Sequence, residues 1–339
     1  MRKLTVAVVI VSYRSAELAV ECLRSLHVER SAGDLSVRAV VIDNASGDHP
    51  LISRAVEANG WASWVTAVLA PRNGGFAYGN NLGIRHALQS GPVDYVYLLN
   101  PDTRVRAGAI AALVRLLESQ PGVGIAGSSF ENEDGSEWPI AFRFPSLVSE
   151  LSHTLGFGPV IRLLDRWSVA REMSQAAGQQ VDWICGASMM IRLAVLERIG
   201  GLDESYFLYF EETDFCLRAR RAGFATWYVP ESRVMHIGGQ STGVTERNKA
   251  PKRLPAYWFD SRRRYFAKAF GTAHAMTIDM VVLIAYPLGW LKRLLLLQQR
   301  QSIPHFYRDF IRRSVLRARN RSFGRLDDPP QLSRGAHGS

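Results

Sequence analysis

The sequence is dominated by short apolar runs that alternate with segments of helical spacing. The runs are rich in Val, Ile and Leu, as strands buried on both faces are. They cover residues 6–11, 37–42, 64–69 and 93–99. Between the first two runs, Leu18, Cys22 and Leu26 recur every four residues, which places them on one face of a helix. This alternation predicts an α/β fold with a mostly parallel central sheet flanked by helices.

Polar residues follow each predicted strand at the edge where such sheets bind ligands. In open α/β sheets, ligands lie beyond the carboxyl ends of the strands. The residues at these ends are Ser12, Tyr13, Asp43, Asn44, Asn73, Gly74, Gly75, Asn100 and Asp102. We therefore expect a binding site to be assembled from these four loops.

A glycine motif at residues 122–127 matches the dinucleotide fingerprint G-x-G-x-x-G, but its context differs. The fingerprint needs a strand, the glycines and then a helix, so that a pyrophosphate meets the helix N-terminus. Here a helical segment and Pro121 precede the glycines and a strand follows, so we interpret the motif as a turn. The absence of G-x-x-x-x-G-K-[ST] and G-x-S-x-G motifs weakens kinase, ATPase and α/β-hydrolase assignments.

Three of the polar loops each allow a structural and a functional interpretation. Asp43 could accept a hydrogen bond from the imide N–H of a pyrimidine, or it could form an Asx-turn that ends the strand. The glycines of residues 72–83 could bring the backbone close to a ligand or allow a tight helix crossing. Asp102 could hold a divalent metal on a diphosphate, or it could cap a helix that begins near Ala107.

The second half of the chain has a weaker pattern with an acidic helix start. We expect a strand over 181–191 that contains Gly186, a helix over 211–223 and a strand over 225–229. Glu211, Glu212 and Asp214 crowd the first turn of this helix, directly after an aromatic run. The helix dipole accounts for one or two of these acids. Crowded acids beside apolar surface also have raised pKa values, which suits a general base.

Single side chains of this half lead to two further inferences. Neighbouring residues on a helix point about 100° apart, so we expect one of Glu211 and Glu212 to face the active site while the other anchors the helix. His236 follows a predicted strand over 233–235, and a lone histidine is most often structural or at the surface. Its position alone assigns it no function.

Charge and cysteine content narrow the class of protein. Residues 247–339 hold 19 Lys and Arg against 5 Asp and Glu, whereas residues 1–246 hold 22 against 26. The net charge of +10 therefore comes from the last quarter of the chain. Cys22, Cys185 and Cys216 have neither the spacing of a disulfide framework nor that of a zinc site, which indicates a reducing cytoplasm.

Several strings in fixed order resemble the family 2 inverting glycosyltransferases, which have a GT-A type nucleotide-binding fold. The strings are VVIVSYRSAELAVECLRSL, VVIDNASGD, NGGFAYGNNLGI, YLLNPDTRV, DWICGASMMIR, GGLDESYFLYFEETDFCLRARRAGF and VMHIGGQST. They cover about residues 4–243 and most resemble the bacterial rhamnosyltransferase-like branch. We expect a GT-A domain over 1–243, divided into a nucleotide-binding half (1–127) and an acceptor half (128–243), then a basic helical extension over 244–325 and a disordered tail over 326–339.

The resemblance implies a nucleotide site and a metal site. The implied nucleotide-binding residues are Ser12, Tyr13, Asp43, Asn44, Asn73, Gly74, Gly75, Asn81 and Asn100. Asp102 matches the last acid of the family's D-x-D motif, which implies Mg²⁺ or Mn²⁺ on the diphosphate. Because Asn100 stands where the motif has its first acid, we expect Asp102 to act with His236.

The resemblance also implies a catalytic base and an acceptor pocket. In the family, the second acid of a Glu-Asp pair is the catalytic base. This position corresponds to Glu212, so a Glu stands here where the family has Asp. The sugar and acceptor pocket is implied at Trp183, Gly186, Ala187 and Glu211. Core packing is an equal alternative for Trp183. The implied reaction is a single displacement with inversion at the anomeric carbon.

The implied donor is a nucleotide sugar, with dTDP-rhamnose preferred and a UDP-hexose or UDP-galactofuranose as the alternative. The implied acceptor is a hydroxyl of a lipid-linked glycan or a cell-surface polysaccharide. A glycoside hydrolase also needs two carboxylates, but it has no use for the nucleotide loops at Asp43 and Asn73. A non-catalytic module that binds nucleic acid or membrane through the basic region is an alternative of another class. Nucleic acid is not expected as a partner, because no binding motif accompanies the arginines.

The basic C-terminal region is expected to form amphipathic helices on the inner face of the cell membrane. Its apolar segment, residues 276–297, is interrupted by Asp279, Pro287, Lys292 and Arg293, and its longest uncharged run, 280–291, is shorter than the ~20 residues that span a bilayer. Charge for anionic lipid is assigned to Arg262, Arg263, Arg264, Lys268, Arg312, Arg313, Arg317, Arg319 and Arg321. The alternative is that these helices pack against the catalytic domain or a second subunit, as in a homodimer.

Overall fold

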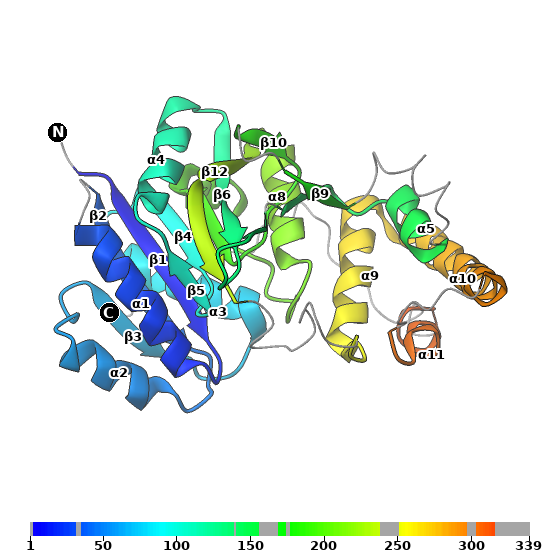
Figure 1. Ribbon diagram of the computed structural model, residues 1–339, viewed down its shortest axis with the longest axis horizontal. Coiled ribbons are helices and arrows are strands. Elements are labelled where there is room, and N and C mark those ends of the chain that lie inside the picture. The colour runs from blue at the N-terminus through cyan, green and yellow to red at the C-terminus, as the bar shows by residue number, and fades with distance from the viewer. Residues whose placement is uncertain are drawn as a thin grey trace, which may run out of the picture.

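The computed structural model describes residues 3–31, 35–138, 140–155, 169–173, 177–237, 251–296 and 303–315. Figure 1 shows an α/β body that holds the central sheet and, beside it, a group of helices that includes α9, α10 and α11. The expected tail over 326–339 and the boundary at 243 lie outside the described residues.

The first half of the body is a parallel sheet with the strand order β4-β1-β2-β3. Its elements are β1 (Thr5–Ser12), α1 (Ala16–Ser31), β2 (Ser36–Asp43), α2 (His49–Ala58), β3 (Val65–Leu69), α3 (Gly75–Gln89) and β4 (Tyr95–Leu99). All five residues of β4 are buried, as expected for a central strand covered on both faces. The predicted strands and the strand–helix alternation are confirmed. Because β1 and β2 pair in register, Ser12 lies beside Asp43 at the carboxyl edge.

The second half extends the same sheet with strands of mixed direction. The elements are β5 (Thr103–Val105), α4 (Ala109–Ser119), β6 (Val123–Glu131), β7 (Glu137–Trp138), β10 (Gln179–Val181), β11 (Ser188–Arg192), α7 (Leu193–Ile199), α8 (Glu211–Arg221) and β12 (Ala225–His236). A separate small sheet pairs β8 (Ile140–Phe142) with β9 (Ala170–Glu172). Strand β11 runs antiparallel between β4 and β6 and so joins the two halves.

Two expectations about this half are wrong. Residues 181–191 are not one strand, because β10 pairs with β12 whereas β11 lies between β4 and β6, and a loop that contains Gly186 connects them. The glycine motif at 122–127 is more than a turn, because β6 begins at Val123 within it. A Cβ at Gly124 would lie 2.5 Å from the Val195 side chain, so this glycine allows close packing within the protein. The division at 127 also falls inside β6.

The C-terminal helices form a second packed unit. They are α9 (Ala256–Phe270), α10 (Thr272–Leu295), α11 (Phe306–Phe310) and the π-helical turn Ile311–Val315. The helix α5 (Leu147–Leu155) comes from the middle of the chain and packs along α10 (Figure 1). A Cβ at Gly289 would lie 2.6 Å from the backbone oxygen of Thr154, so the small residue lets the two helices approach closely.

The cationic side chains of α9 point into the protein, which contradicts their assignment to anionic lipid. Arg262 is 1% exposed and donates to Glu150 of α5 and to Asp279 of α10. Arg263 is also buried, and it pairs with Asp279. Both guanidinium groups therefore form ion pairs inside the protein and are not available to bind lipid.

Two more cations of α9 are used in the same way. Lys268 is buried and pairs with Asp203 and Asp214, and Arg264 also pairs with Asp203. The alternative that the helix packs against the catalytic domain is therefore the one observed for α9. Arg317, Arg319 and Arg321 lie outside the described residues.

Pro287 does not interrupt α10, contrary to expectation. Proline removes the hydrogen bond that the carbonyl four residues earlier would accept, here that of Leu283. The hydroxyl of Tyr307 donates to this Leu283 carbonyl oxygen at 3.2 Å, so the acceptor stays satisfied. The resulting helix of 24 residues is long and apolar enough to cross a membrane, and about a third of its most apolar stretch is buried inside the protein.

Replacing Arg262 tests whether the buried ion pairs hold the helical unit together. We expect Arg262→Met to lower the free energy of unfolding by about 3–5 kcal/mol, because Glu150 would lose its guanidinium partner and Asp279 would keep only Arg263. Arg24→Met is the control, since Arg24 is 58% exposed and forms only a surface pair with Glu21, worth about 0–1 kcal/mol. Urea unfolding measures both, and equal losses would contradict a structural role for the buried network.

Candidate active site

The loops after β2 and β3 meet at the carboxyl edge of the sheet, as predicted. Asn44 Nδ2 donates to Asn73 Oδ1 and to the Gly75 carbonyl oxygen, each at 3.1 Å, and Gly74 N donates to Asn44 Oδ1 at 3.4 Å. The loop after β1 joins them, because Asn44 N donates to the Ser12 carbonyl oxygen at 2.8 Å. These expected nucleotide-binding residues therefore form one connected structure.

Asp43 forms the turn that was the structural alternative. Its Oδ1 accepts hydrogen bonds from Ser46 N at 2.9 Å and Ser46 Oγ at 2.6 Å, and its Oδ2 accepts one from His49 N at 3.0 Å. Burial alone would raise the pKa of Asp43, but these hydrogen bonds outweigh it and lower the pKa. The carboxylate is thus ionised and fixed, and its contact with a base remains a prediction.

The glycines of the segment 72–83 serve close packing against protein. Gly75 has a φ of +86°, and a Cβ there would overlap the carbonyl oxygen of Phe207. The neighbouring Phe76 N donates to this same oxygen at 2.9 Å. A Cβ at Gly79 would lie 2.6 Å from Val11, so this glycine lets α3 approach β1, as the helix-packing alternative proposed.

Asn81 makes internal hydrogen bonds, and its assignment to the nucleotide site stays a prediction. It is 2% exposed, and its Nδ2 donates to the Leu202 carbonyl oxygen at 2.8 Å and to Glu204 Oε1 at 3.0 Å. Its Oδ1 accepts a hydrogen bond from Leu202 N at 2.9 Å. The side chain therefore fixes the loop after α7, more than 100 residues along the chain.

Asp102 and His236 are brought together, as expected for a metal pair. Strand pairing places Thr103 of β5 opposite His236 of β12, and His236 Nε2 lies 3.4 Å from Asp102 Oδ1. Both residues are buried, and neither ring nitrogen of His236 has a hydrogen-bond partner among the described residues. Asp102 is not a helix cap, since α4 begins at Ala109 after Gly108.

This pair fits a partial site for a divalent metal. A carboxylate oxygen and an unpartnered imidazole nitrogen are both metal ligands, and an orphaned buried nitrogen is otherwise unfavourable. Within the described ranges, no group of three or more His, Cys, Asp or Glu is placed to hold an ion. Asp102 and His236 would therefore supply two ligands, and substrate oxygens or water would supply the others.

The three acids at the start of α8 divide into two kinds. Asp214 is paired with cations, since Arg218 Nε lies 2.8 Å and Lys268 Nζ lies 3.0 Å from its carboxylate. Glu211 and Glu212 have no ion pair among the described residues, and the Oε2 of each is shielded without a hydrogen-bond partner. Asp214 therefore anchors the helix, and the two glutamates are available for chemistry.

Glu211 and Glu212 influence each other's ionisation, and the expected division of roles between them stays a prediction. Burial raises the pKa of both carboxyl groups. The charge of Glu212 and a hydrogen bond to it raise the pKa of Glu211 further, whereas the same hydrogen bond lowers that of Glu212. The pKa of Glu211 is therefore raised more than that of Glu212.

The loop between β10 and β11 connects the acid pair with the metal pair. A Cβ at Gly186 would lie 2.9 Å from the Phe76 ring and 4.0 Å from Glu212 Cβ, so the missing side chain lets this loop pack closely against Phe76 and beside Glu212. Burial raises the pKa of Cys185 to about 12, and the charges of Glu212 and Asp102 both contribute. The thiol thus lies near both pairs.

Backbone contacts complete this part of the site. Asn100 N donates to the Ala187 carbonyl oxygen at 3.0 Å, which fixes the loop on the end of β4. Trp183 stacks on Phe142 with centroids 4.1 Å apart, and its Nε1 donates to the Arg143 carbonyl oxygen at 2.9 Å. Packing is therefore observed for Trp183, and its contact with sugar remains a prediction.

Sequence patterns missed three contributors to the site. Cys185, Phe76 and the Phe207 carbonyl oxygen are placed there by contacts between distant segments. None of the three has a motif of its own. Only the glycines that they contact, Gly75 and Gly186, give a signal in the sequence, because a residue without Cβ often marks close approach.

Tyr13 is partly buried, and the guanidinium of Arg14 lies 5.3 Å from its ring centroid.

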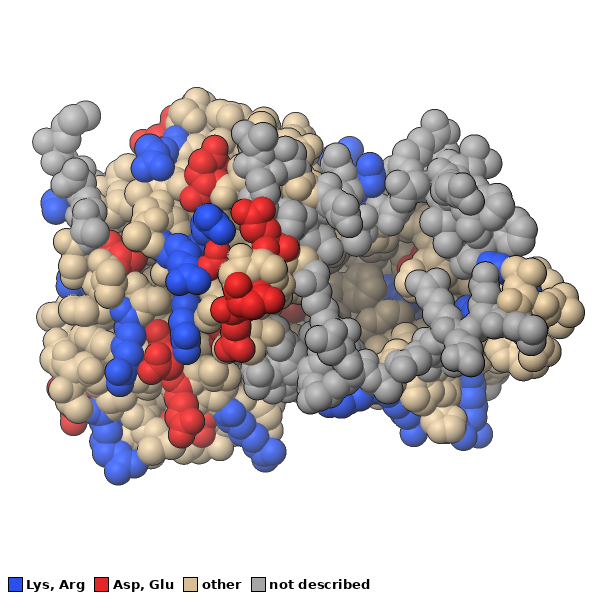
Figure 2. Space-filling view, in the orientation of Figure 1, with Lys and Arg blue, Asp and Glu red and all other residues tan. Residues whose placement is uncertain are grey.

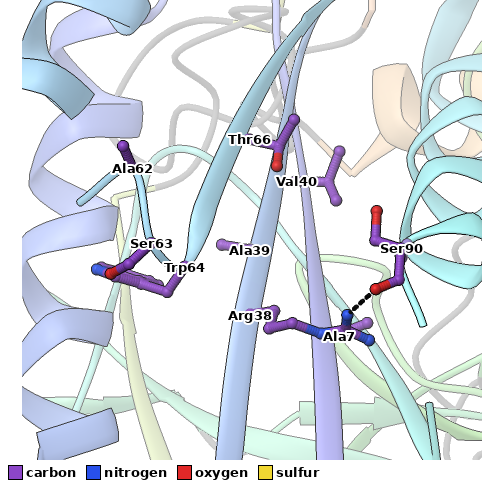
Figure 3. A pocket seen from close by; sticks show the side chains of 10 residues that line it. Ala7, Arg38, Ala39, Val40, Ala62, Ser63, Trp64, Thr66 and Ser90 are labelled. Carbon is purple, nitrogen blue, oxygen red and sulfur yellow. Dashed lines mark hydrogen bonds between the residues drawn. The ribbon is translucent and has the colours of Figure 1, made fainter. Parts of the chain in front are cut away.

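A small pocket of about 220 Å³ lies away from this site (Figure 3). Residues from the beginnings of β2 and β3 and from the end of α3 line it, so it lies toward the amino ends of the strands. Arg38 of this pocket donates to the carbonyl oxygens of Ser90 and Pro92. We therefore assign the pocket no role in the chemistry at the carboxyl edge.

The fold and the site define a GT-A type glycosyltransferase. The family described as glycosyltransferase like family 2 matches residues 3–252, and the chain belongs to this family. The mannosyltransferase PcManGT from Pyrobaculum calidifontis, solved with GDP-Man and Mn²⁺, superposes with a TM-score of 0.53 at 17% identity, covering 94% of this chain and 85% of that one. GalNAc-T7, solved with UDP, GalNAc and Mn²⁺, superposes with a TM-score of 0.54 at 16% identity. The match covers 93% of this chain and 57% of that one.

Curated relatives are more similar in sequence over shorter stretches. The N-acetylglucosaminyl-diphospho-decaprenol L-rhamnosyltransferase of Mycobacterium tuberculosis is 33% identical over 152 residues, 44% of this chain and 49% of that protein. The hexosyltransferase Agl10 of Haloferax volcanii, named for low-salt glycan biosynthesis, is 30% identical over 217 residues, 63% and 61% of the two chains. Rhamnosyltransferase WbbL of Escherichia coli K12 is 26% identical over 165 residues, 48% and 60%. The chain thus matches about half the length of the mycobacterial relative.

Removing Asp102 tests the metal pair. We expect Mn²⁺ to strengthen binding of a nucleoside diphosphate to the unmodified protein, and Asp102→Ala to abolish this effect, because the only carboxylate of the pair is lost. His236→Ala should weaken the metal response less. Thermal shift with dTDP or UDP, with and without Mn²⁺, measures the response. An unchanged response in Asp102→Ala would exclude this site.

Glycine substitutions test the contact between the loop of α3 and Phe207. Gly75→Ala should destabilise the protein by more than Gly47→Ala, because both glycines have positive φ but only Gly75 has a backbone atom in the way of a Cβ. We expect a difference of at least about 1 kcal/mol in the free energy of unfolding. Equal losses in chemical unfolding would show that the close approach is unimportant.

Proposed function

We propose that this protein is an inverting glycosyltransferase that transfers L-rhamnose from dTDP-rhamnose to a hydroxyl of a lipid-linked glycan or polysaccharide. The observation that carries the proposal is a shielded acid, Glu212, with no cation partner among the described residues, in the same site as the Asp102 and His236 pair. Family membership and the rhamnosyltransferase names of two relatives support the choice of reaction and sugar.

Glu212 has the properties of the general base. It lies beside the backbone of Gly186, in the loop that connects β10 with β11. Its raised pKa favours proton uptake, and the pKa of the neighbouring Glu211 is raised further. As Glu212 takes the hydroxyl proton, the acceptor oxygen bonds to the anomeric carbon and the bond to the nucleoside diphosphate breaks, with inversion.

The remaining site residues bind and orient the donor. The connected loops of Ser12, Asp43, Asn44 and Asn73 would hold the nucleoside at the carboxyl edge. Asp102 and His236 would hold Mg²⁺ or Mn²⁺, which when bound offsets negative charge on the diphosphate leaving group. Because the acceptor is attached to a lipid, we place the enzyme at the cytoplasmic surface of the cell membrane.

A hexose donor is the second candidate. The relative Agl10, which is named a hexosyltransferase, matches a longer part of this chain than the rhamnosyltransferases do. Both candidates share the proposed chemistry and differ in the nucleotide and the sugar of the donor. The internal pairing of the α9 cations removes the main support for a non-catalytic binding module.

The test incubates the full chain and Mn²⁺ with dTDP-rhamnose, UDP-glucose or UDP-galactofuranose and a polyprenyl-diphospho-sugar acceptor. Mass spectrometry identifies the transferred sugar, and NMR gives the configuration of the new bond. We expect a mass gain of one deoxyhexose from dTDP-rhamnose, with inverted configuration. Hexose transfer would replace the donor assignment, and retained configuration would overturn the mechanism.

Replacing Glu212 tests its role as base. Glu212→Gln should lower turnover by ~10² or more while nucleotide binding and folding persist, because the amide keeps the shape but cannot take a proton. Glu211→Gln is the matched control and should retain more activity, since its amide can still donate to Glu212. A larger loss in the control would move the base to Glu211.

The pH dependence follows from the same assignment. The base must be ionised, so activity should fall as the pH decreases through the pKa of Glu212, which lies above its usual value of 4.5. Rates measured across pH at saturating donor should therefore show an acid limb above pH 4.5. A flat profile down to pH 4.5 would contradict the assignment.

A further inference from the structure

The outward face of α10 is apolar along the whole helix. Every residue that is highly exposed between Thr272 and Leu295 is uncharged. The large exposed side chains are Met276, Met280, Ile284, Leu288, Trp290, Leu291, Leu294 and Leu295, each between 47% and 72% exposed. Soluble monomers rarely expose so continuous an apolar surface, and such a patch usually marks an interaction site.

The spacing of these residues places them on one side of the helix. Met276, Met280, Ile284 and Leu288 follow at intervals of four, and Leu291 and Leu295 continue the same side. The opposite side carries the buried residues Ala275, Ile278, Asp279, Val282, Ala285 and Gly289. The helix is thus inverted relative to an ordinary surface helix, because its single acid faces the protein and its large apolar residues face outward.

Basic residues border one end of this face. Lys292 and Arg293 are in the last turn of α10, and exposed Arg308 and Arg312 are in α11 and the following turn. These elements are adjacent, since Tyr307 bonds to the backbone of α10 and stacks on Tyr286 with centroids 5.2 Å apart. In Figure 2, Lys and Arg gather along the lower edge of this helical group. An apolar face bordered by cations complements the surface of an anionic bilayer.

A second copy of the chain is a weaker match for this face. The clustered cations would repel one another across a symmetric contact between two copies, whereas they attract an anionic surface.

We propose that the outward face of α10 is a membrane-docking surface that inserts into the interface of an anionic bilayer. Only the role of this surface rests on the proposed function: docking would hold the active site beside a lipid-linked acceptor. The helix lies along the surface and does not cross it, because its other side is tied to the protein through Asp279, Arg262 and Arg263. Crossing would require these ion pairs and the contact of Gly289 with α5 to break.

Vesicle flotation of the full chain tests the docking surface. We expect the unmodified protein to float with vesicles of phosphatidylglycerol and phosphatidylcholine and to float much less with phosphatidylcholine alone. The double variant Ile284→Glu, Leu288→Glu should reduce the bound fraction at least tenfold, since it puts two charges into the inserted face. Leu51→Glu is the matched control, because Leu51 is a 51% exposed residue of α2 in the α/β body.

Folding, oligomeric state and activity are measured on the same samples. Circular dichroism checks that each variant is folded, and light scattering after gel filtration gives the mass in solution. No binding of the unmodified protein, equal binding of the double variant, or a dimer that the double variant dissolves would overturn the proposal. Transfer to a short soluble acceptor should be unchanged in the double variant. Vesicle binding without transfer by the unmodified protein would refute the proposed function and leave the docking surface standing.

Discussion

The position of the candidate active site depends on a buried cation, Lys268 of α9. Its Nζ lies 2.6 Å from Asp203 and 3.0 Å from Asp214, which are in the loop before α8 and in the first turn of α8. Arg218 also binds Asp214, and it donates to the carbonyl oxygens of Ile199 at the end of α7 and of Gly201 in the loop that follows. A buried charge without its partner is strongly unfavourable, so these groups hold one arrangement. Helix α8 therefore presents its glutamates only in a protein that also has α9 in place.

The presence or absence of a cation partner distinguishes the structural acids of this region from the candidate catalytic acids. Asp203 and Asp214 are satisfied by cations, and those interactions outweigh burial and lower the pKa of Asp203 well below its usual range. Glu211 and Glu212 have no cation partner among the described residues, so burial raises their pKa values. Neighbouring acids on one helix turn thus differ in protonation because of the elements packed against them.

Sequence patterns predicted those features that depend on local order. The parallel strands, the helix that begins at Glu211 and the meeting of Asn44 with Asn73 follow from periodicity and from the geometry of α/β sheets. The pairing of Asp102 with His236 came from the family resemblance, since more than 130 residues separate them. The internal contacts of Asn81 could not be predicted, because its partner, the Leu202 backbone, is distant in sequence and a backbone group leaves no motif.

The C-terminal region shows why composition alone gave the wrong surface. A count of cations treats Arg262 and Arg312 alike, yet the first is buried between two carboxylates and the second is exposed. Likewise, Pro287 predicts a break in α10 only while the Leu283 carbonyl lacks a donor, and Tyr307 from a later helix supplies one. Once the cations turn inward and the proline is accommodated, the large apolar side chains of α10 are left outside. Which side chains remain at the surface to contact a partner therefore depends on which charged and polar groups already pair between neighbouring helices.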